Sequence, residues 1–584
     1  MEKQWLLTSN HTQDQESKLF NELISFTKNP DSTTKSAYRI FTKLLLQRKI
    51  TTVPQAIVFN KLEMDQLHDP FLMLNMQKAV HRISTAISKN QKIMVYGDYD
   101  VDGTTSVALM TSFLKPICEN LMYYIPDRYT EGYGVSYQGI DTAKEENVDL
   151  IIALDCGIKA VDKVAYANEK GIDFIICDHH TPGDIIPDAI AVLDPKQSDC
   201  NYPYKELPGC GIGFKLCQAL QFQLQLDFNL ESLLDLVAIS IACDIVPVTG
   251  ENRVLASMGL KLINTAPRAS IKAILGEMDP NSRIRITNLV FQIGPKINAA
   301  GRISSGKTAV DMLLSSEKTE ILKFTTQINT YNEERKEKDK SITDEALSII
   351  AKDPELIQKN SNVLFHPNWH KGVVGIVASR VIEKYYKPTI ILTHSSDGII
   401  GGSVRSVSGF DVYQALEKCS DHMLQFGGHK YAAGLTLKTE QLSDFIQKFE
   451  DVVCEQMATG VFVPTIHYDC EIKLDDINFK LKALIDKLEP FGPQNMTPTF
   501  IVSHVIDTGN SRAVGADKTH LKLEVTDPES GVIVPAIAFG LGHLEEKVQS
   551  GISMSLSFTV DINYWNNREI LQLMVKDIRF TDMQ

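Results

Sequence analysis

Length, composition and charge narrow the class of protein before any motif is considered. The chain has 584 residues, too many for one compact core, so about three or four domains are expected. Hydrophobic residues make up 43% of it, and no apolar stretch reaches the ~18 residues of a membrane span, which excludes a membrane protein. The net charge of -14 weighs against a polyanionic partner but does not exclude one, because carboxylates can cluster around metal ions while cations line a groove.

The N-terminus and the cysteines indicate the compartment. The first residues, MEKQWLLTSNHTQDQESK, contain no apolar run of signal-peptide length, so a cytoplasmic protein is expected. The ten cysteines are scattered without a CxxC pair. This pattern predicts buried thiols in a reducing cytoplasm rather than a zinc site or a disulfide framework.

Residues 1–60 form the first predicted region, a helical segment that ends in a polar stretch around Val53 and Pro54. A doubly wound α/β domain is expected over residues 61–314. Its predicted strands are 92–96, 148–154 and 172–177. Each strand is apolar on both faces, as buried parallel strands are. An amphipathic helix closed by Gly171 separates the last two, and this alternation is typical of a doubly wound parallel sheet.

Three further regions complete the expected organisation. The charged segment 315–350, which contains EERKEKDK, predicts a solvated helix that connects two domains. A second α/β domain is expected over residues 351–453, with strands at 363–366 and 389–393. Residues 454–584 alternate apolar and polar positions, as in THLKLEV, and predict a small antiparallel β domain.

The segment YGDYDVDGTTSVALM carries the strongest chemical signal. Asp98, Asp100 and Asp102 alternate directly after an apolar strand, so an extended backbone would place all three carboxylates on one side. Carboxylates crowded in this way raise one another's pKa unless a cation neutralises them. An acidic loop or a helix cap is the plain alternative, but it accounts for one aspartate more readily than for three.

Two more predicted strands and one apolar run end in acidic groups. The strands run into Asp155 and into Asp178-His179-His180, and the run LLDLVAISIAC precedes Asp244. These groups are expected to converge, because the carboxyl ends of parallel strands form the ligand crevice of an open sheet. An Asp/His set without cysteine suits Mg²⁺ or Mn²⁺ better than zinc. Two such ions can drive phosphoryl displacement, so hydrolysis of a phosphodiester or phosphoanhydride is predicted.

The order and spacing of these motifs resemble a known family. GDYDVDG, ALDCG, CDHH and ACDIVP look like the four acidic motifs of the DHH phosphoesterase superfamily. With PDRYTEGYG at 126–134 and GPKINAAGR at 294–302, the pattern resembles the RecJ branch, a family of single-stranded-DNA-specific exonucleases. GGHKYAAG at 427–434 resembles a motif of the companion DHHA1 domain, and the terminal β region is similar to the OB-fold domain of that branch.

The resemblance implies a set of site residues around two divalent ions, Mn²⁺ or Mg²⁺. The implied metal ligands are Asp98, Asp100, Asp155, His179 and Asp244. His180 is implied beside the metals, either as an orienting group or as a proton donor to the leaving oxygen. Asp102 is implied to support the ligands rather than to bind metal directly. His429 is implied to face the metal centre across an interdomain cleft.

Glycines next to arginines indicate the substrate-binding side. Gly301-Arg302 and the run GGSVRS each join a glycine, which permits close approach of the backbone, to an arginine suited to bidentate phosphate contact. The residues that the resemblance implies for substrate binding are Arg128, Lys296, Asn298, Arg302, Ser403 and Arg405. Two positions depart from the family. Lys296 stands where arginine is common, so its phosphate contact would lack the bidentate fork, and Tyr96 stands where histidine is frequent.

The resemblance implies a metal-dependent 5′→3′ exonuclease of single-stranded DNA in recombination and repair. It also implies a monomer without membrane association, with single-stranded DNA, a single-strand-binding protein and a RecQ-type helicase as partners. Two alternatives stay open: hydrolysis of oligoribonucleotides or cyclic dinucleotides, and a catalytically inactive replication scaffold. The extra β domain weighs against the first alternative, and the presence of all five implied ligands weighs against the second. The β domain has no basic footprint, so its binding of single strands rests on the resemblance.

Overall fold

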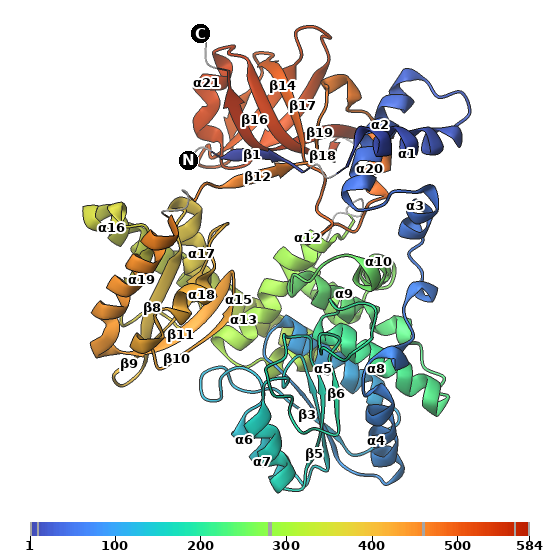
Figure 1. The fold of residues 1–584 in the computed structure, drawn as a ribbon, viewed down its shortest axis with the longest axis vertical. Helices are drawn as coiled ribbons and strands as arrows, with labels where there is room; N and C mark the ends of the chain where they lie inside the picture. The colour runs from blue at the N-terminus through green and yellow to red at the C-terminus, as the bar shows by residue number, and fades with distance from the viewer. Residues whose placement is uncertain (1–2, 9–10, 278–282, 458–461, 566–567, 582–584) are drawn as a thin grey trace. The chain divides into compact units, whose positions relative to one another are not determined.

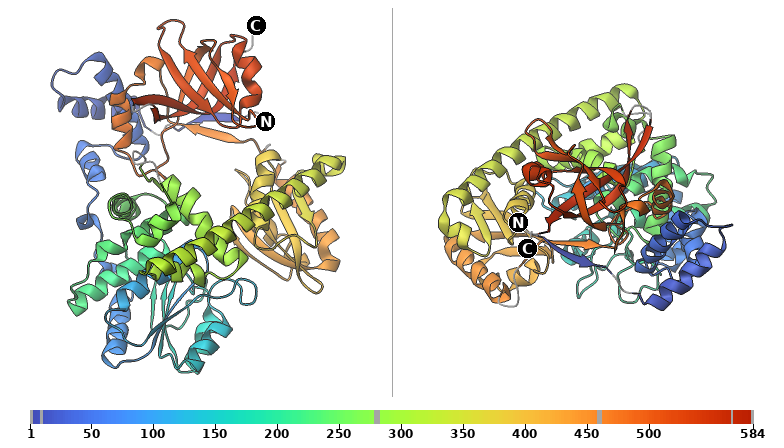
Figure 2. Two further views of the ribbon diagram at one scale, coloured as in Figure 1. Left: turned by 180° about the vertical axis from the view of Figure 1, so that it is seen from behind. Right: turned by 90° about the horizontal axis from the view of Figure 1, so that it is seen from above.

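The computed structural model describes residues 3–8, 11–277, 283–457, 462–565 and 568–581. They form two compact units: Glu63–Phe462 is one, and Met1–Leu62 joins Val463–Gln584 in the other. Figures 1 and 2 show the elements of both units. Within the described ranges, no helix has the length and apolar content that crossing a membrane requires.

The larger unit contains a parallel five-stranded sheet in the order β3-β2-β4-β5-β6. Its strands are β2 (Ile93–Gly97), β3 (Leu121–Tyr124), β4 (Leu150–Leu154), β5 (Asp173–Cys177) and β6 (Ala191–Leu193). Every residue of β2 and β4 is buried, which explains their unbroken apolar sequences. The chain continues from β2 to β3 on one side and then to β4 on the other. Ligands of open sheets bind at the carboxyl ends of strands at such a switch point.

Helices cover both faces of this sheet (Figure 1). One apolar core holds α4 (Met76–Ser88), α5 (Val101–Leu114), α8 (Gly209–Leu224) and α9 (Leu234–Cys243). On the other face, α6 (Tyr137–Glu145) and α7 (Val161–Glu169) pack against Tyr96, Ile151 and Ile176 of the strands. The predicted doubly wound parallel sheet is therefore confirmed, including the helix before Gly171.

After α9 the described chain is helical as far as the second sheet. The elements are α10 (Gly250–Thr265), α11 (Ala269–Leu275), α12 (Ile286–Asn288), the π-helix η4 (Leu289–Ile293), α13 (Gly294–Ile303), α14 (Lys307–Leu314), α15 (Lys318–Lys352) and α16 (Pro354–Gln358). α15 contains the charged run EERKEKDK and is 35 residues long. It packs against α13 and α14 at one end and against α17 (Val374–Lys384) at the other, so it connects the two α/β parts of this unit.

The second sheet of the larger unit is mixed, in the order β10-β11-β9-β8-β7. Its strands are β7 (Asn362–Phe365), β8 (Thr389–Ser396), β9 (Ile399–Arg405), β10 (Gln425–His429) and β11 (Ala432–Lys438). Only β7 and β8 pair in parallel, and the remaining neighbours are antiparallel. α18 (Val412–Glu417) and α19 (Leu442–Met457) share one apolar core with this sheet, and α17 packs against β8 and β9.

The smaller unit is built on a seven-stranded sheet in the order β13-β14-β18-β19-β17-β16-β15. The strands are β13 (Cys470–Glu471), β14 (Phe500–Asp507), β15 (Arg512–Val514), β16 (His520–Thr526), β17 (Ile533–Ala538), β18 (Met554–Trp565) and β19 (Arg568–Phe580). An additional pairing of β14 with β16 curls the sheet towards a barrel. The predicted β domain is confirmed, although β17–β19 and β13–β14 pair in parallel.

The N-terminal helices belong to this smaller unit. They are α1 (Gln13–Ser25), α2 (Ser32–Gln47) and α3 (Val53–Asn60), and the same unit contains the α-helices α20 (Phe479–Asp486) and α21 (Glu545–Gln549). Leu19 and Leu44 share one apolar core with Phe500 and Leu556 of the β-sheet. Residues from both ends of the chain therefore build a single core, which the sequence pattern did not predict.

A short strand strengthens this association. β1 (Gln4–Leu7) pairs in parallel with β12 (Thr465–Tyr468). The indole N–H of Trp5 donates to Asp577 Oδ2 at 2.8 Å, and the Arg579 guanidinium lies 4.2 Å from the centroid of the Trp5 ring. Together these contacts attach the N-terminal strand to β19.

Candidate metal centre and adjoining arginine cavity

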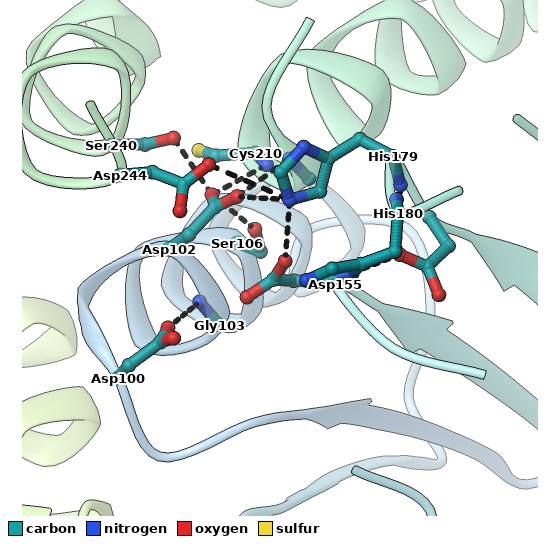
Figure 3. Close-up of polar contacts among 12 residues, drawn as sticks. Asp100, Asp102, Gly103, Ser106, Asp155, His179, His180, Cys210, Ser240 and Asp244 are labelled. Carbon is teal, nitrogen blue, oxygen red and sulfur yellow. Dashed lines mark hydrogen bonds and ion pairs between the residues drawn. The ribbon is translucent and has the colours of Figure 1, made fainter. Parts of the chain in front are cut away.

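The acidic groups predicted at the strand ends meet at one edge of the parallel sheet (Figure 3). His179 Nε2, after β5, lies 3.1 Å from Oδ1 of Asp155, which follows β4. The same nitrogen lies 3.5 Å from Asp244 Oδ2 and 3.7 Å from Asp102 Oδ2. Asp244 reaches the cluster from the C-terminal end of α9. The convergence expected from parallel topology is present.

Asp102 reaches this cluster by a different route from the expected one. α5 begins at Val101, and Asp100 caps it by accepting a hydrogen bond from the Gly103 N–H at 3.0 Å. The expectation of an extended backbone through Asp102 is therefore wrong, because the chain has already turned into a helix. Gly103 allows this turn, since a Cβ there would lie 2.3 Å from the carbonyl oxygen of Asp98.

Asp102 is held by the protein itself. Its carboxylate accepts hydrogen bonds from the backbone N–H groups of Gly209 and Cys210, at 2.6 and 2.9 Å, and from Ser240 Oγ at 2.7 Å. The two backbone donors lie at the start of α8, where helix N–H groups stabilise an anion. Both oxygens of Asp102 therefore have donors.

The carboxylates of Asp98, Asp155 and Asp244 have fewer hydrogen-bond donors than that of Asp102. Each has a buried oxygen, Oδ2, without a hydrogen-bond donor in the described part of the chain. Burial first, and then the charges of neighbouring aspartates, raise the pKa of all three carboxyls well above its ordinary range. Burial also lowers the pKa of His179 to about 4, so this imidazole is neutral and can act as a ligand. Buried carboxylate oxygens beside a neutral imidazole fit a divalent cation.

The implied metal ligands lie at the carboxyl ends of the strands, beside a cavity. Among the described residues, two groups have ligand atoms close enough together to hold a metal ion: Asp155 with His179 and His180, and Asp102 with His179 and Asp244. A cavity of about 270 Å³, here called the carboxylate cavity, is lined by residues that include Asp100, Asp102, Asp244, Tyr133, Asn298 and Arg302. Asp98 lies close enough to Asp100 for that charge to raise its pKa, after the larger effect of burial. Which residues bind a metal stays a prediction.

Two residues at the cluster have left-handed backbone conformations. The φ angle is 60° at Asp155 and 59° at Ile245, the neighbour of Asp244. Non-glycine residues adopt this conformation at a cost, and such strain gathers at functional sites. Gly209 provides the space next to Asp155, because a Cβ at Gly209 would lie 2.6 Å from the Asp155 Cβ.

His180 is oriented by Asp178, a residue for which the sequence pattern predicted no separate role. The distance from His180 Nδ1 to Asp178 Oδ1 is 2.7 Å, and the other Asp178 oxygen accepts the N–H of Ile158 at 2.9 Å. Burial disfavours the charged ring, but the hydrogen bond and charge of Asp178 outweigh it and raise the pKa of His180 to about 9. His180 Nε2 lies 3.4 Å from the hydroxyl of Tyr133, which lines the carboxylate cavity. The sequence signal for Asp178 was its position at a buried strand end.

A second cavity, of about 440 Å³, is here called the arginine cavity. It is lined by four of the residues that the resemblance implies for substrate binding: Arg128, Arg302, Ser403 and Arg405. Arg302 donates to the carbonyl of Gly372 at 2.8 Å, and Arg405 donates to Ser403 Oγ at 2.7 Å. Within the described ranges, none of these arginines forms an ion pair with a carboxylate. Burial, followed by the charges of Arg128 and Arg405, lowers the pKa of Arg302 to about 10.

The first turn of α17 also lines the arginine cavity, through Val374 and Gly375. A helix N-terminus presents free backbone N–H groups and favours an anion. Gly375 keeps this approach open, because a Cβ there would lie 2.8 Å from Arg405 Nη2 and 3.0 Å from Ser403 Oγ. Guanidiniums without counter-charges beside a helix N-terminus fit a phosphate group.

Lys296 and His429 lie outside the lining of both cavities and outside the carboxylate cluster. Lys296 Nζ donates to the carbonyl of Ile274 in α11 at 2.7 Å. His429, at the end of β10, is exposed, and its Nδ1 accepts the N–H of Tyr431 at 3.3 Å. Burial and then the charges of Arg405 and His180 lower the pKa of His429, which places it within electrostatic range of both cavities.

Comparisons with known proteins agree with this architecture. The models described as DHH family N-terminal domain, DHHA1 domain and RecJ OB domain match residues 92–241, 358–455 and 468–577. The single-stranded-DNA-specific exonuclease RecJ of Bacillus subtilis (strain 168) is 36% identical over 93% of this chain and 68% of its own length. The RecJ of Salmonella typhimurium is 33% identical over 86% of this chain and 89% of its own length.

The fold is also that of a solved structure. RecJ from Thermus thermophilus, in complex with Mn²⁺, matches with a TM-score of 0.81 at 23% identity, over 99% of this chain and 80% of that one. All three domain types occur here in one chain, and full-length relatives are more than 30% identical to it. The chain therefore belongs to the RecJ family of single-stranded-DNA-specific exonucleases.

Proposed function

We propose that this protein is a metal-dependent 5′→3′ exonuclease of single-stranded DNA that acts in recombination and repair. One observation carries the proposal: Arg128 and Arg302 line both the carboxylate cavity and the arginine cavity. A terminal phosphate bound by the arginines would present the neighbouring phosphodiester to the carboxylates and imidazoles. The RecJ relatives are named for this substrate, and the 5′→3′ direction rests on membership of their family.

The proposed cofactors are two divalent ions, Mn²⁺ or Mg²⁺. The residues that would hold them are Asp98, Asp100, Asp155, His179 and Asp244. Bound ions of this kind activate a water molecule and stabilise both the attacking and the leaving oxygens of an in-line displacement. Asp102 would support the metal ligands rather than bind a metal ion, because Gly209, Cys210 and Ser240 already donate hydrogen bonds to its oxygens.

The residues of the chain have separate tasks in this reaction. Asp178 fixes the His180 ring through Nδ1, which leaves Nε2 free to give a proton to the departing oxygen. Arg405, Ser403 and Arg302 would bind the 5′-terminal phosphate beside the N-terminus of α17. Asn298 would contact the strand within the carboxylate cavity.

One further residue belongs to the proposal. His429, at the end of β10, would face the metal centre, whereas Lys296 has no part in it because its Nζ donates to the carbonyl of Ile274. A single-strand-binding protein and a RecQ-type helicase are proposed partners of a monomeric enzyme, on the strength of family membership alone. The two alternatives are less well supported, because the β domain exceeds what a dinucleotide needs and all five implied ligands are present.

The test is the degradation of labelled substrates by the purified chain. Single strands labelled at the 5′ or the 3′ end, duplex DNA and RNA dinucleotides are incubated with Mn²⁺, with Mg²⁺ or with EDTA. The expected result is release of 5′-labelled mononucleotides from single-stranded DNA with either metal, and no release in EDTA. Preferred cleavage of RNA dinucleotides would favour the first alternative, and no cleavage of any substrate would favour the scaffold.

A further inference from the structure

The loop between β3 and α6, residues 125–136, lines both cavities without belonging to a helix or a strand. Arg128 lines both of them, Gly132 lines the arginine cavity, and Tyr133 lines the carboxylate cavity. An irregular loop that carries functional side chains needs its own anchor, because no ladder of backbone hydrogen bonds fixes it.

Glu131 provides this anchor from within the loop. Its Oε1 accepts the N–H of Asp127 at 2.8 Å, and both of its oxygens accept the hydroxyl of Tyr124, at 3.1 and 3.0 Å. Oε2 also accepts the hydroxyl of Ser136. One carboxylate therefore ties the last residue of β3, the first half of the loop and the residue that caps α6.

Tyr96, one of the two residues that depart from the family pattern, also anchors the loop. Its buried hydroxyl donates to the carbonyl of Gly134 at 3.1 Å and accepts the N–H of Ser136 at 3.2 Å. Its ring stacks on that of Tyr124 with centroids 5.3 Å apart. A Cβ at Gly139 would lie 2.6 Å from the Tyr96 ring, so the start of α6 closes over these two rings only with glycine at this position.

The anchored loop reaches the carboxylate cluster at two points. The N–H of Gly134 donates to Asp98 Oδ1 at 3.2 Å, whereas Oδ2 of the same carboxylate has no hydrogen-bond donor among the described residues. The hydroxyl of Tyr133 lies 3.4 Å from His180 Nε2. Movement of the loop would therefore alter both an implied ligand and the proposed proton donor.

The same loop reaches the arginine cavity at two other points. The Arg128 guanidinium lies 4.1 Å from the centroid of the Tyr99 ring, which also lines that cavity. The hydroxyl of Tyr129 donates to the backbone carbonyl of Arg302. The first contact positions the Arg128 guanidinium directly. The second positions Arg302 through its backbone.

We propose that Glu131 is a positioning residue. By holding this loop in place, it fixes the side chains that line the arginine cavity relative to those of the carboxylate cavity. The inference rests on the proposed function and deepens it. Glu131 is absent from the described lining of both cavities, so it acts through Arg128, Gly134 and Tyr133 rather than on the substrate. Residues that orient site groups in this way typically contribute about 10- to 100-fold to activity or metal affinity.

The test compares Glu131→Ala with Glu131→Gln and with Glu146→Ala, a control that removes an exposed carboxylate paired with Lys92. Glu131→Ala is expected to raise KM for 5′-phosphorylated single strands about 10-fold or more and to reduce their advantage over 5′-hydroxyl strands. Glu131→Gln keeps an acceptor for the Asp127 N–H and can hydrogen-bond a hydroxyl, so it should recover most of the loss. The control should match the wild type in KM and in thermal unfolding.

Two binding measurements separate this inference from the proposed function. Fluorescence anisotropy with a 5′-phosphorylated oligothymidylate in EDTA reports on the arginine cavity, and calorimetric titration with Mn²⁺ alone reports on the carboxylate cluster. Both affinities should fall in Glu131→Ala while its Tm stays near that of the wild type. If the wild type degrades nothing but these shifts appear, the proposed function fails and the role of Glu131 stands. Unchanged affinities and KM, or a fall in Tm that Glu131→Gln does not rescue, would overturn the role.

Discussion

The carboxylate cavity and the arginine cavity adjoin, yet they are built in opposite ways. The carboxylate cluster comes from strand ends and helix ends of one domain, where Asp155, His179 and Asp244 each follow a buried apolar run. The arginine cavity takes Arg128 from a loop, Arg302 from α13 and Arg405 from β9. Parallel topology brings Asp155 and His179 together, and the end of α9 adds Asp244, whereas the arginine set depends on packing between distant segments.

The two cavities also differ in electrostatics, because one gathers negative charge and the other gathers positive charge. In the carboxylate cluster, the buried carboxyls of Asp155 and Asp244 lie close to other aspartates, and their pKa values rise because burial and mutual repulsion disfavour ionisation. In the arginine cavity, guanidiniums stay charged without a carboxylate partner in the described part of the chain. Each cavity is short of the opposite charge, which a cation would supply to the first and a phosphate to the second.

Removal of an implied metal ligand should have the largest effect. Asp155→Ala or His179→Ala is expected to reduce hydrolysis of single-stranded DNA to background, because the remaining side chains would not hold the two proposed ions in place. The fold should survive, since both residues follow strands rather than lie within them. Asp162→Asn, a change at an exposed aspartate of α7, is the control. Turnover by either variant at the wild-type rate, measured with excess Mn²⁺, would remove that residue from the ligand set.

His180→Ala should have the next largest effect, on the chemical step and not on the binding of the strand. A general acid typically contributes about 10²- to 10⁴-fold, so kcat should fall within that range while KM changes little. Asp178→Asn keeps the ring but weakens its orientation, and a loss of about 10- to 100-fold is expected. His81→Ala, at an exposed position of α4, controls for loss of an imidazole. Equal loss in Asp178→Asn and His180→Ala would mean that orientation accounts for the whole effect.

Arg405→Ala should separate the two cavities. Loss of a charge-assisted hydrogen bond costs about 1.5–3 kcal/mol, so binding of 5′-phosphorylated single strands should weaken by roughly 10- to 150-fold. Hydrolysis should still require metal, because the carboxylate cluster is untouched. Arg380→Ala removes an exposed arginine of α17 that pairs with Glu383 and is the matched control. If Arg405→Ala discriminates between phosphorylated and hydroxyl ends as the wild type does, Arg405 has no part in end recognition.

Removal of the smaller unit should have the least effect on the reaction itself. The fragment Glu63–Phe462 retains every residue of both cavities, so turnover of very short oligonucleotides should change little. KM for long single strands should rise, because each base stacked on a distal platform contributes about 1–3 kcal/mol. The deletion has to include Met1–Leu62, since Leu19 and Leu44 would otherwise lose the core that buries them. Equal losses on long and short substrates would show that the smaller unit supports folding rather than binding.

The sequence predicted the parallel sheet and its acidic edge because both follow from short-range patterns. Strands buried on both faces read as unbroken apolar runs, and parallel topology then brings Asp155 and His179 together. It failed where a local turn decided the outcome. The helix that begins at Val101 carries Asp102, and period-two reasoning could not detect it.

Other features could not be read from local pattern at all. Family resemblance placed Lys296 near phosphate, but a long flexible side chain can be directed elsewhere by one available carbonyl, here that of Ile274. The pairing of β1 with β12 joins segments that are far apart in the sequence through four residues of each strand. A segment this short carries too little pattern to identify its partner.

The arrangement of the smaller unit has a consequence for how the protein reaches its native state. Its core needs Leu19 from the start of the chain and Leu556 from near its end, so along the chain the whole larger unit is an insertion within it. During synthesis the N-terminal helices leave the ribosome first, yet they cannot bury their apolar faces until the final strands follow. The larger unit can complete its own core in the meantime, because all of its elements are then available. We therefore expect the larger unit to fold first and the smaller unit to fold last. During translation, residues 1–62 would then be the segment most dependent on chaperones.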